Sequence, residues 1–182
     1  MKALVIIGSK NISGRTATSA NAICDGIIES GGEVEKIFLT NLKIERCRQC
    51  EDNGWGICDT KGRCIIDDDF ASLIKKITAV DIIIFATPVY FSELSESMRA
   101  FINRLRRTCI NDDAHPEYKE KLVIGICMAG GSGSGSVACC LTLETALLRC
   151  GFNVIDMIPV KRQNINVKLR VLKMIGGSLV EK

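Results

Sequence analysis

The chain has 182 residues, of which 47% are hydrophobic and 25% charged, and its formal net charge is +3 at pH 7. A chain of this length can bury a sizeable core, and we expect a single domain over residues 1–182. So small a net charge gives no reason to expect a nucleic-acid or membrane partner. No apolar stretch approaches the ~20 residues that cross a bilayer, and the first residues lack a signal-peptide pattern, so a cytoplasmic location is expected.

The chain contains ten cysteines. In a reducing compartment a disulfide framework would be unusual, so these residues are expected to be core thiols, metal ligands or redox groups. Several lie within apolar strand or helix patterns and are expected to be core thiols: Cys24, Cys127, Cys139, Cys140 and Cys150.

Residues 2–7 form a short apolar run that is typical of a buried strand, and a loop rich in glycine and hydroxyl side chains follows it. Apolar residues then recur at helical spacing from 20 to 28. The free N–H groups and the dipole at a helix start favour an anion, so this loop predicts a phosphate site. The alternative is an ordinary strand-to-helix connection with a hydroxyl cap. The loop has neither the Gly-Lys-Ser/Thr ending of a Walker loop nor a Gly-x-Gly-x-x-Gly turn.

Two glycines end that helix, and residues 33–38 predict a second strand. A cysteine-rich segment at about 44–66 follows as an insertion. Three aspartates at 67–69 then precede a helix with apolar residues from 70 to 77. We expect these acids to complement the helix dipole rather than to bind a metal.

The run from Ile82 to Phe85 is apolar on both faces, as in a central strand of a parallel sheet. Pro88 has no N–H to donate, so the chain is expected to leave the sheet at Thr87. A loop at 87–92 leads into an amphipathic helix that starts near residue 94, with Ser92 or Ser95 as its cap. Ligands of open α/β sheets lie beyond the carboxyl ends of the strands, where this loop is expected.

The second half of the chain repeats this alternation. A strand at 122–129 leads through a glycine-serine stretch at 130–136 into a helix at 137–150, and a strand at 153–159 precedes a last helix around 167–175. We interpret the glycine-serine stretch as a close approach of backbone to a flat ligand. The lone His115 is expected to be solvated. The fold class is therefore α/β, a flavodoxin-like five-stranded parallel sheet of order 2-1-3-4-5 with helices on both faces.

These residues resemble the flavodoxin-fold NAD(P)H-dependent FMN reductases, and among them the iron-sulfur flavoproteins. Gly8-Ser9 with Gly14 and Thr16 resembles the family's phosphate loop, although Lys10, Asn11 and Arg15 depart from it. The loop at 87–92 and the following Met98, Phe101 and Arg104 resemble the family's ring-binding loop and helix. The resemblance implies an FMN site made of three loops, with these cofactor-binding residues: Ser9, Asn11, Ser13, Arg15, Thr16, Thr87, Pro88, Val89, Tyr90, Phe91, Ser92, Gly130, Gly131 and Ser132.

The resemblance also implies an oxidoreductase that passes electrons from NAD(P)H through FMN to a flavin, quinone or redox-protein acceptor. The flavin would carry the chemistry, so no catalytic side chain is expected. Arg104, Arg106 or Arg107 would meet the coenzyme's phosphates, or lie on a solvated helix face. Two alternatives remain: an electron carrier that does not use NAD(P)H directly, and a flavin-free binding or regulatory domain. A homodimer or homotetramer is implied by the resemblance alone.

Four cysteines of the insertion, Cys47, Cys50, Cys58 and Cys64, are candidate metal ligands. Two thiolates three residues apart, followed by two more, can complete a four-ligand set for a 4Fe-4S cluster or zinc. They resemble the compact cysteine motif of the iron-sulfur flavoproteins, although Asn53 stands where that motif has a cysteine. Unligated or redox-active thiols are the alternative.

Overall fold

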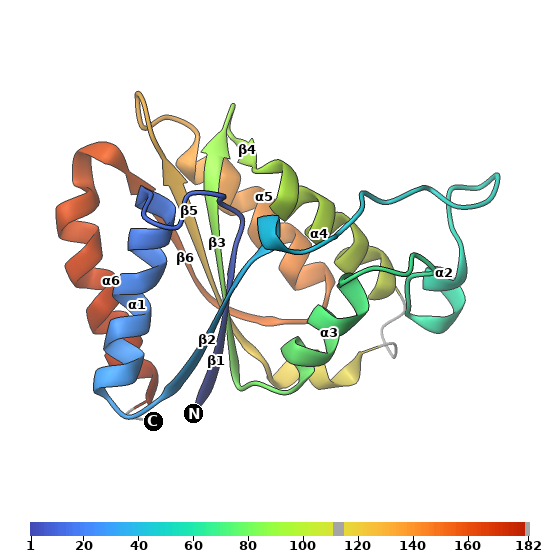
Figure 1. Cartoon of the computed structure of the whole chain (residues 1–182), viewed down its shortest axis with the longest axis horizontal. Helices are drawn as coiled ribbons and strands as arrows, with labels where there is room; N and C mark the ends of the chain where they lie inside the picture. Colours follow the sequence, from blue (N-terminus) through green and yellow to red (C-terminus); the bar gives the residue numbers. More distant parts are fainter. Residues whose placement is uncertain (111–114, 181–182) are drawn as a thin grey trace.

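The computed structural model describes residues 1–110 and 115–180. Its sheet has the order that the sequence predicts, with five parallel strands and a short antiparallel strand, β4, at the carboxyl end of β3 (Figure 1). The strands of the parallel sheet, in spatial order, are β2 (Glu33–Phe38), β1 (Lys2–Ile7), β3 (Ile82–Tyr90), β5 (Leu122–Ala129) and β6 (Asn153–Lys161). The flavodoxin-like expectation is therefore confirmed.

Helices cover both faces of the sheet, as expected (Figure 1). One face carries α1 (Arg15–Glu29) and α6 (Ile165–Val180), and the other carries α3 (Phe70–Thr78), α4 (Glu96–Thr108) and α5 (Ser136–Arg149). The short helix α2 (Ile57–Lys61) lies within the cysteine-rich segment, and the sequence analysis did not predict it. Short 3-10 turns lie at 39–41 (η1), 116–120 (η2) and 162–164 (η3).

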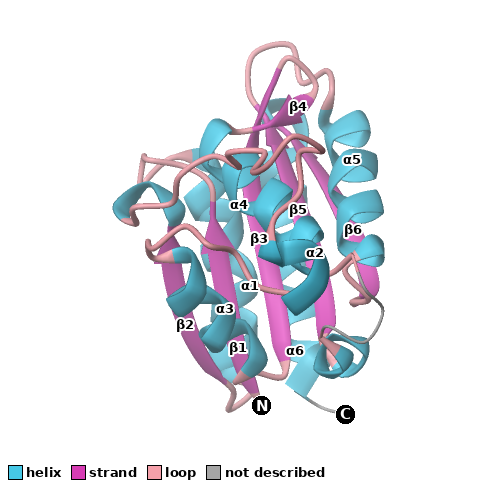
Figure 2. Ribbon diagram, turned by 90° about the vertical axis from the view of Figure 1, so that its right-hand side faces the viewer, coloured by secondary structure: helices cyan, strands magenta, loops and turns pink. Residues whose placement is uncertain are grey.

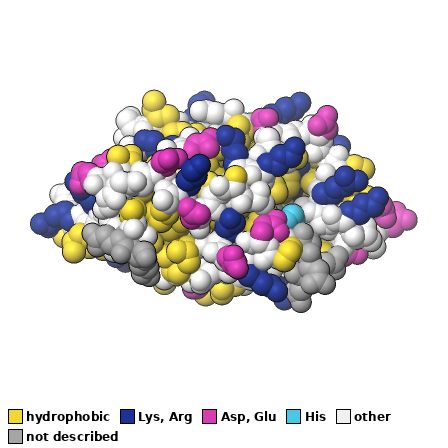
Figure 3. All heavy atoms as spheres, turned by 90° about the horizontal axis from the view of Figure 1, so that it is seen from below, with side chains coloured by type: hydrophobic (Ala, Val, Ile, Leu, Met, Phe, Trp, Pro, Cys, Tyr) yellow, Lys and Arg dark blue, Asp and Glu magenta, His cyan; other side chains and the backbone are white. Residues whose placement is uncertain are grey.

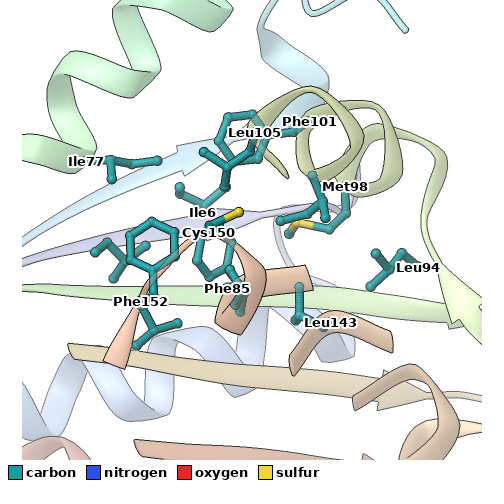
Figure 4. Close-up of a cluster of buried hydrophobic side chains, with 14 of the residues drawn as sticks. Ile6, Ile77, Phe85, Leu94, Met98, Phe101, Leu105, Leu143, Cys150 and Phe152 are labelled. Atoms are coloured by element: carbon teal, nitrogen blue, oxygen red, sulfur yellow. The ribbon is translucent and has the colours of Figure 1, made fainter. Parts of the chain in front are cut away.

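The central strands are buried on both faces because their apolar runs do not alternate with polar residues. In β3, Ile83 and Phe85 join the core under α3, α4 and α5, while Ile82 and Ile84 join the core under α1 and α6. Figure 4 shows the first of these cores, with Phe85 on the sheet below Phe101 and Met98 of α4. The two cores together hold β3 in the centre of the molecule.

The pairing of α1 with α6 depends on two glycines. A Cβ added at Gly26 would lie 2.0 Å from the carbonyl oxygen of Lys173, and one at Gly176 would lie 2.1 Å from that of Ile23. The two helix backbones therefore approach more closely than any side chain would allow. Among the described residues, no helix is both long enough and apolar enough to cross a membrane.

The prediction that the chain leaves the sheet at Thr87 is wrong, because β3 continues through Pro88 to Tyr90 and folds back through β4 (Glu93–Leu94), as Figure 2 shows. Proline is tolerated here because β1 ends at Ile7, opposite Ala86. Beyond that point β5 is the only parallel neighbour that the described residues give β3, so one side of Pro88 needs no hydrogen-bond donor. Leu94 accordingly belongs to β4, and Ser95 is the residue that caps α4.

The last helix, α6, begins near the expected position. Val167 and Val171 are exposed, whereas Leu172, Gly176 and Leu179 face the core. Figure 3 views the end of the molecule where the parallel strands begin, and there charged groups of both signs are scattered among apolar ones. The loops that follow β1, β3 and β5 lie at the opposite end, where the strands finish.

Candidate functional site

A cavity of about 750 Å3 lies at the carboxyl end of the sheet, where three loops meet. The loops follow β1, β3 and β5, which are neighbours in the sheet. Because the strands are parallel, their carboxyl ends share one edge, and loops far apart in sequence converge there. The cavity, called the three-loop pocket here, is lined by Ser9, Asn11, Gly14, Arg15, Thr16, Pro88, Val89, Tyr90, Phe91, Ser92, Met128, Ala129, Gly130, Gly131, Ser132 and Ser134.

The first loop presents the start of helix α1 to the pocket. Its N-cap, Gly14, provides no side-chain cap, and the first turn contains no acidic residue. The first backbone N–H groups of α1 therefore have no intrahelical partner, and Arg15 adds a positive charge beside them. Asn11 shapes the loop, since its Oδ1 accepts hydrogen bonds from the Ser13 backbone N–H at 3.0 Å and from the Ser13 Oγ at 3.1 Å. This arrangement suits an anion.

The second loop is the β3–β4 connection, and its apex points into solvent. Phe91 is fully exposed, and Phe91 and Ser92 both have positive φ, at 51° and 67°. The base of the loop is held by Ser95, whose Oγ donates to the Gly8 carbonyl oxygen at 2.7 Å and whose N–H donates to Thr87 Oγ1 at 3.2 Å. These bonds fix the second loop against the end of β1. Phe91 is therefore not packed in the core.

The third loop follows β5 and is built from glycine and serine. Gly131 and Gly133 have positive φ, at 38° and 78°, which favours glycine at both positions. Gln163 supports this loop from η3, since its Nε2 donates to the carbonyl oxygen of Ser132 at 3.0 Å. A Cβ at Gly130 or Gly131 would meet no atom within 4 Å, so the pocket side of this loop is open.

Twelve of the fourteen residues predicted to bind a cofactor line the three-loop pocket. The two exceptions are Ser13, whose hydroxyl turns to Asn11, and Thr87, which is buried beneath the second loop. Four further residues line the pocket but were not among the predicted cofactor-binding residues: Gly14, Met128, Ala129 and Ser134. Met128 and Ala129 end β5 and form a buried part of the lining, and their position at the end of an apolar strand was the available signal.

The cysteine-rich segment forms a separate feature against α4. Cys47, Cys50, Cys58 and Cys64 all line one cavity, which is small, about 20 Å3. Among the described residues, however, no group of three or more His, Cys, Asp or Glu side chains is placed to hold a metal ion. The four thiols are therefore brought to one place but do not form a ligand set. The five cysteines expected to be core thiols are buried.

The segment is fixed to α4 by a buried ion pair that the sequence analysis missed. Both Nη atoms of Arg104 donate to the Asp68 carboxylate, and the two side chains are 1% and 0% exposed. The aspartates at 67–69 were expected only to complement the α3 dipole. Asp68 does accept the Phe70 N–H at the start of α3 through its Oδ1, at 3.1 Å, but it also forms this ion pair. Burial tends to raise the pKa of Asp68, but the bonds from Arg104 and from two backbone N–H groups hold it below its usual value.

Arg104 also lies beside the cysteines. Burial tends to lower its pKa, yet the hydrogen bonds to Asp68 and the neighbouring Cys64 thiol keep the pKa raised. The guanidinium is 4.3 Å from the centre of the Phe70 ring, and its Nε has no partner among the described residues. His115, expected to be solvated, instead contacts this segment, with its Nε2 3.0 Å from the carbonyl oxygen of Gly62.

The sheet order and the three-loop pocket at its carboxyl edge define a flavodoxin-like protein. More narrowly, the family model described as NADPH-dependent FMN reductase matches residues 1–166, and the chain belongs to that family. The family resemblance drawn from the sequence is thereby confirmed.

Individual relatives are consistent with this assignment. The chain is 34% identical over 105 residues to an iron-sulfur flavoprotein of Archaeoglobus fulgidus, which covers 58% of this chain and 46% of that protein. It is 29% identical over 131 residues to an iron-sulfur flavoprotein of Methanocaldococcus jannaschii, and this match covers 72% of this chain and 65% of that protein. The matches thus span less than two thirds of those relatives' lengths. A solved NAD(P)H:quinone oxidoreductase from Methanothermobacter marburgensis shares the fold, with a TM-score of 0.75 at 15% identity, covering 98% and 96% of the two chains.

Proposed function

We propose that this chain binds FMN non-covalently in the three-loop pocket and acts as an oxidoreductase, passing electrons from NAD(P)H to a flavin, a quinone or a redox protein. The observation that carries the proposal is the pocket itself: an uncapped helix start and two further loops surround one cavity of about 750 Å3. Membership of the NADPH-dependent FMN reductase family supports the same function.

The residues present fit the parts of FMN. The uncapped N-terminus of α1 with Ser9, Asn11, Arg15 and Thr16 offers donors to a phosphate, which prefers such helix starts. The second and third loops supply open backbone and the exposed side chains of Tyr90 and Phe91, which suit a flat ring. Among the described residues that line the pocket, no further segment is left for an adenosine, so FMN is favoured over FAD.

When bound, FMN supplies the hydride and electron transfer, and the protein supplies placement. The start of α1 and Arg15 hold the phosphate end. The backbone of the second loop, fixed by Ser95, and that of the third loop, supported by Gln163, orient the ring. Phe91 and Tyr90 stand at the mouth, where they limit the access of water to a bound ring and leave one side open to a second substrate.

Anaerobic mixing tests the proposal. The purified protein is reconstituted with FMN, freed of excess flavin, and mixed with NADPH or NADH while flavin absorbance is followed. We expect quenched flavin fluorescence on binding and rapid bleaching by at least one coenzyme. Bleaching only by dithionite would leave an electron carrier that does not use NAD(P)H, and failure to retain FMN would leave a flavin-free binding domain.

The second candidate is an iron-sulfur and FMN electron-transfer protein, favoured by the four cysteines that line one cavity and by the names of the relatives. The thiols as arranged do not fit a metal or cluster, so segment 44–66 would have to close around one. Two proteins, the unmodified chain and Cys50→Ser, are purified anaerobically and assayed for iron, zinc and acid-labile sulfide. These assays distinguish an iron-sulfur protein from an FMN oxidoreductase without a cluster. A cluster requires about four irons and sulfides per chain, lost in the variant. Metal-free protein with a full complement of FMN excludes this candidate.

We also propose a homo-oligomer. Three apolar side chains on the outer face of α5, Val137, Leu141 and Leu148, are 64%, 63% and 55% exposed. An exposed apolar stripe of this kind favours burial against another chain. Light scattering after size exclusion should give a dimer or tetramer mass, and Leu141→Glu should shift it to the monomer. A monomer in the unmodified protein would exclude the proposal.

A further inference from the structure

A second large hollow lies on the surface of α4, away from the three-loop pocket. It has a volume of about 590 Å3 and runs between the start of the cysteine-rich segment and the outer face of α4. In Figure 1 that segment leaves the sheet after β2 and passes α4 on its way to α2. This hollow, called the arginine groove here, shares no residue with the three-loop pocket and is lined by Arg46, Cys47, Arg48, Gln49, Glu96, Arg99, Ala100, Asn103, Arg106 and Arg107.

The lining is strongly and selectively basic. Five of its residues are arginines and one, Glu96, is acidic, while none of the thirteen lysines of the chain takes part. On α4, Arg99, Asn103 and Arg106 follow one another at helical spacing, so they share a face. Arg46 and Arg48 lie on the opposite wall. Guanidinium groups, rather than charge alone, are thus gathered around one hollow.

Three of the five guanidiniums are held in place. The Arg107 guanidinium lies 4.3 Å from the centre of the Trp55 ring, and its Nη1 donates to the Gly54 carbonyl oxygen at 2.8 Å. Arg48 is paired with Glu45 at 2.8 Å, and Arg99 with Glu93 at 2.9 Å. Three of the donors that a ligand would meet are therefore already held by neighbouring groups, which lowers the entropy cost of ordering them on binding.

The positive charge of the groove is not balanced by the protein that the structure describes. Arg46 and Arg106 are exposed and form no ion pair or hydrogen bond with a described residue, and Arg107 is bonded only to a carbonyl oxygen. Glu96 is the one carboxylate in the lining. Like charges held this close repel one another, and a concave wall concentrates their field. An anion in the groove would relieve that repulsion.

The chemistry of the lining identifies the anion. The planar guanidinium offers paired donors that match the oxygens of phosphate, and several such groups around one hollow match adjacent phosphates. The volume lies within the range of small-molecule sites, whereas a protein partner would need a much wider surface. We propose that the arginine groove binds a nucleotide through its diphosphate group. This proposal goes beyond the flavin function and does not require it.

Titration calorimetry on the FMN-loaded protein tests the proposal, with inorganic pyrophosphate as the first probe and ADP as the second, at constant ionic strength. Both should bind, and orthophosphate should bind at least about tenfold more weakly because it offers one phosphate instead of two. The double variant Arg46→Ala with Arg106→Ala should weaken pyrophosphate and ADP at least about tenfold, since each lost charge-assisted bond accounts for roughly that factor. Arg106→Lys should also weaken binding, because it keeps the charge but loses the fork.

The matched control removes two exposed positive charges elsewhere, Arg170→Ala on α6 and Lys75→Ala on α3, and should leave binding unchanged. Equal weakening in the control, or equal affinity for orthophosphate, would reduce the groove to a diffuse charge effect and overturn the proposal. Binding of polyglutamate without pyrophosphate would overturn it in favour of an acidic protein.

NADPH and 2′,5′-ADP, titrated in parallel, identify the source of the diphosphate. If the groove holds the reducing coenzyme, the double variant raises the KM for NADPH without changing the maximal rate of flavin bleaching. If KM is unchanged while ADP binding is lost, the groove serves a different nucleotide. Failure of flavin bleaching in the unmodified protein would count against the proposed function alone, because pyrophosphate binding is measured without turnover.

Discussion

The buried pair of Arg104 and Asp68 is the most consequential interaction at the level of single residues. It joins α4 to the end of the cysteine-rich segment, and Arg104 Nη1 also donates to the carbonyl oxygen of Glu45 at 3.2 Å. Because both side chains are excluded from water, removing one leaves the other charge buried without a partner. Such a loss is costly even where the intact pair itself contributes little.

Asp68→Asn should therefore lower the free energy of unfolding by roughly 3–5 kcal/mol at pH 7, as measured by urea denaturation. Glu29→Gln provides the control, because it breaks the Lys173 pair, whose side chains are 48% and 61% exposed, and should cost at most about 1 kcal/mol. If both variants lowered the free energy of unfolding equally, the buried Arg104–Asp68 pair would contribute no more to stability than an exposed ion pair.

The same pair predicts a pH dependence. Burial tends to raise the pKa of Asp68, but the bonds from Arg104 together with those from two backbone N–H groups hold it below the ordinary aspartate value of about 3.9. A lowered folded-state pKa contributes stability that is complete above the unfolded pKa and is lost as the pH falls through the folded pKa. The difference between the unmodified protein and Asp68→Asn should thus be constant from pH 7 to 5 and shrink below about pH 4.

Among the elements, helix α1 has a start that is arranged for a ligand rather than for its own stability. It has no side-chain cap, no acid in its first turn, and Arg15 at its first position, where a positive charge opposes the helix dipole. Two effects of opposite sign follow for Arg15→Glu. The ligand-free protein should gain about 0.3–1 kcal/mol, while FMN affinity should fall at least about tenfold.

Riboflavin separates these effects, since it has the ring of FMN but no phosphate. Its affinity should be nearly the same in Arg15→Glu and in the unmodified protein when both are measured by fluorescence quenching. A parallel loss of riboflavin binding would mean that the substitution has disturbed the pocket as a whole.

The packing of α1 on α6 offers a second prediction at this scale, with adjacent glycines as test and control. A Cβ at Gly176 would meet the carbonyl oxygen of Ile23 at 2.1 Å, so Gly176→Ala must push the helices apart and should cost roughly 1–3 kcal/mol. At Gly177 the nearest contact is the Ser30 Oγ at 3.3 Å, and alanine is the better helix former by up to about 1 kcal/mol. Thermal unfolding should therefore show a lower Tm for Gly176→Ala and an equal or higher one for Gly177→Ala.

At the scale of the whole molecule, the sequence was most informative where one local signal determines the outcome. Unbroken apolar runs identified the central strands, and parallel order then placed the loops that follow β1, β3 and β5 at one edge. The sequence was least informative where the outcome depends on a distant partner. From the sequence, Asp68 is expected only to start a helix, but in the fold it pairs with Arg104. Pro88 is expected to end a strand, but β3 continues through it because β1 ends first.

The same reasoning explains why two of the predicted cofactor-binding residues do not line the three-loop pocket. Ser13 and Thr87 have the right chemistry and lie in the right loops, but each is engaged by a neighbour, Asn11 and Ser95 respectively. Arg106 and Arg107 were expected either to meet the coenzyme's phosphates or to lie on a solvated helix face, but the arginine groove as a whole was not predicted. Its two walls, at 46–49 and 96–107, are separated in the sequence by α3 and β3. Only the folded chain brings those arginines together.

Because the three loops of the pocket belong to β1, β3 and β5, FMN should stabilise the molecule as a whole rather than one loop. These strands form the centre of the sheet and connect the two cores, so local opening of the site without loss of the core is unfavourable. At an FMN concentration of one hundred times Kd, linkage adds about 2.7 kcal/mol. For a chain of 182 residues each kcal/mol raises Tm by roughly 2–4 °C, so a shift of roughly 5–11 °C is expected.

Far-UV circular dichroism and tryptophan fluorescence should report the same shift. Trp55 lies outside the pocket, so its fluorescence follows the shift only if unfolding is cooperative. A shift seen by flavin release but absent from both of these probes would show that FMN stabilises the loops alone.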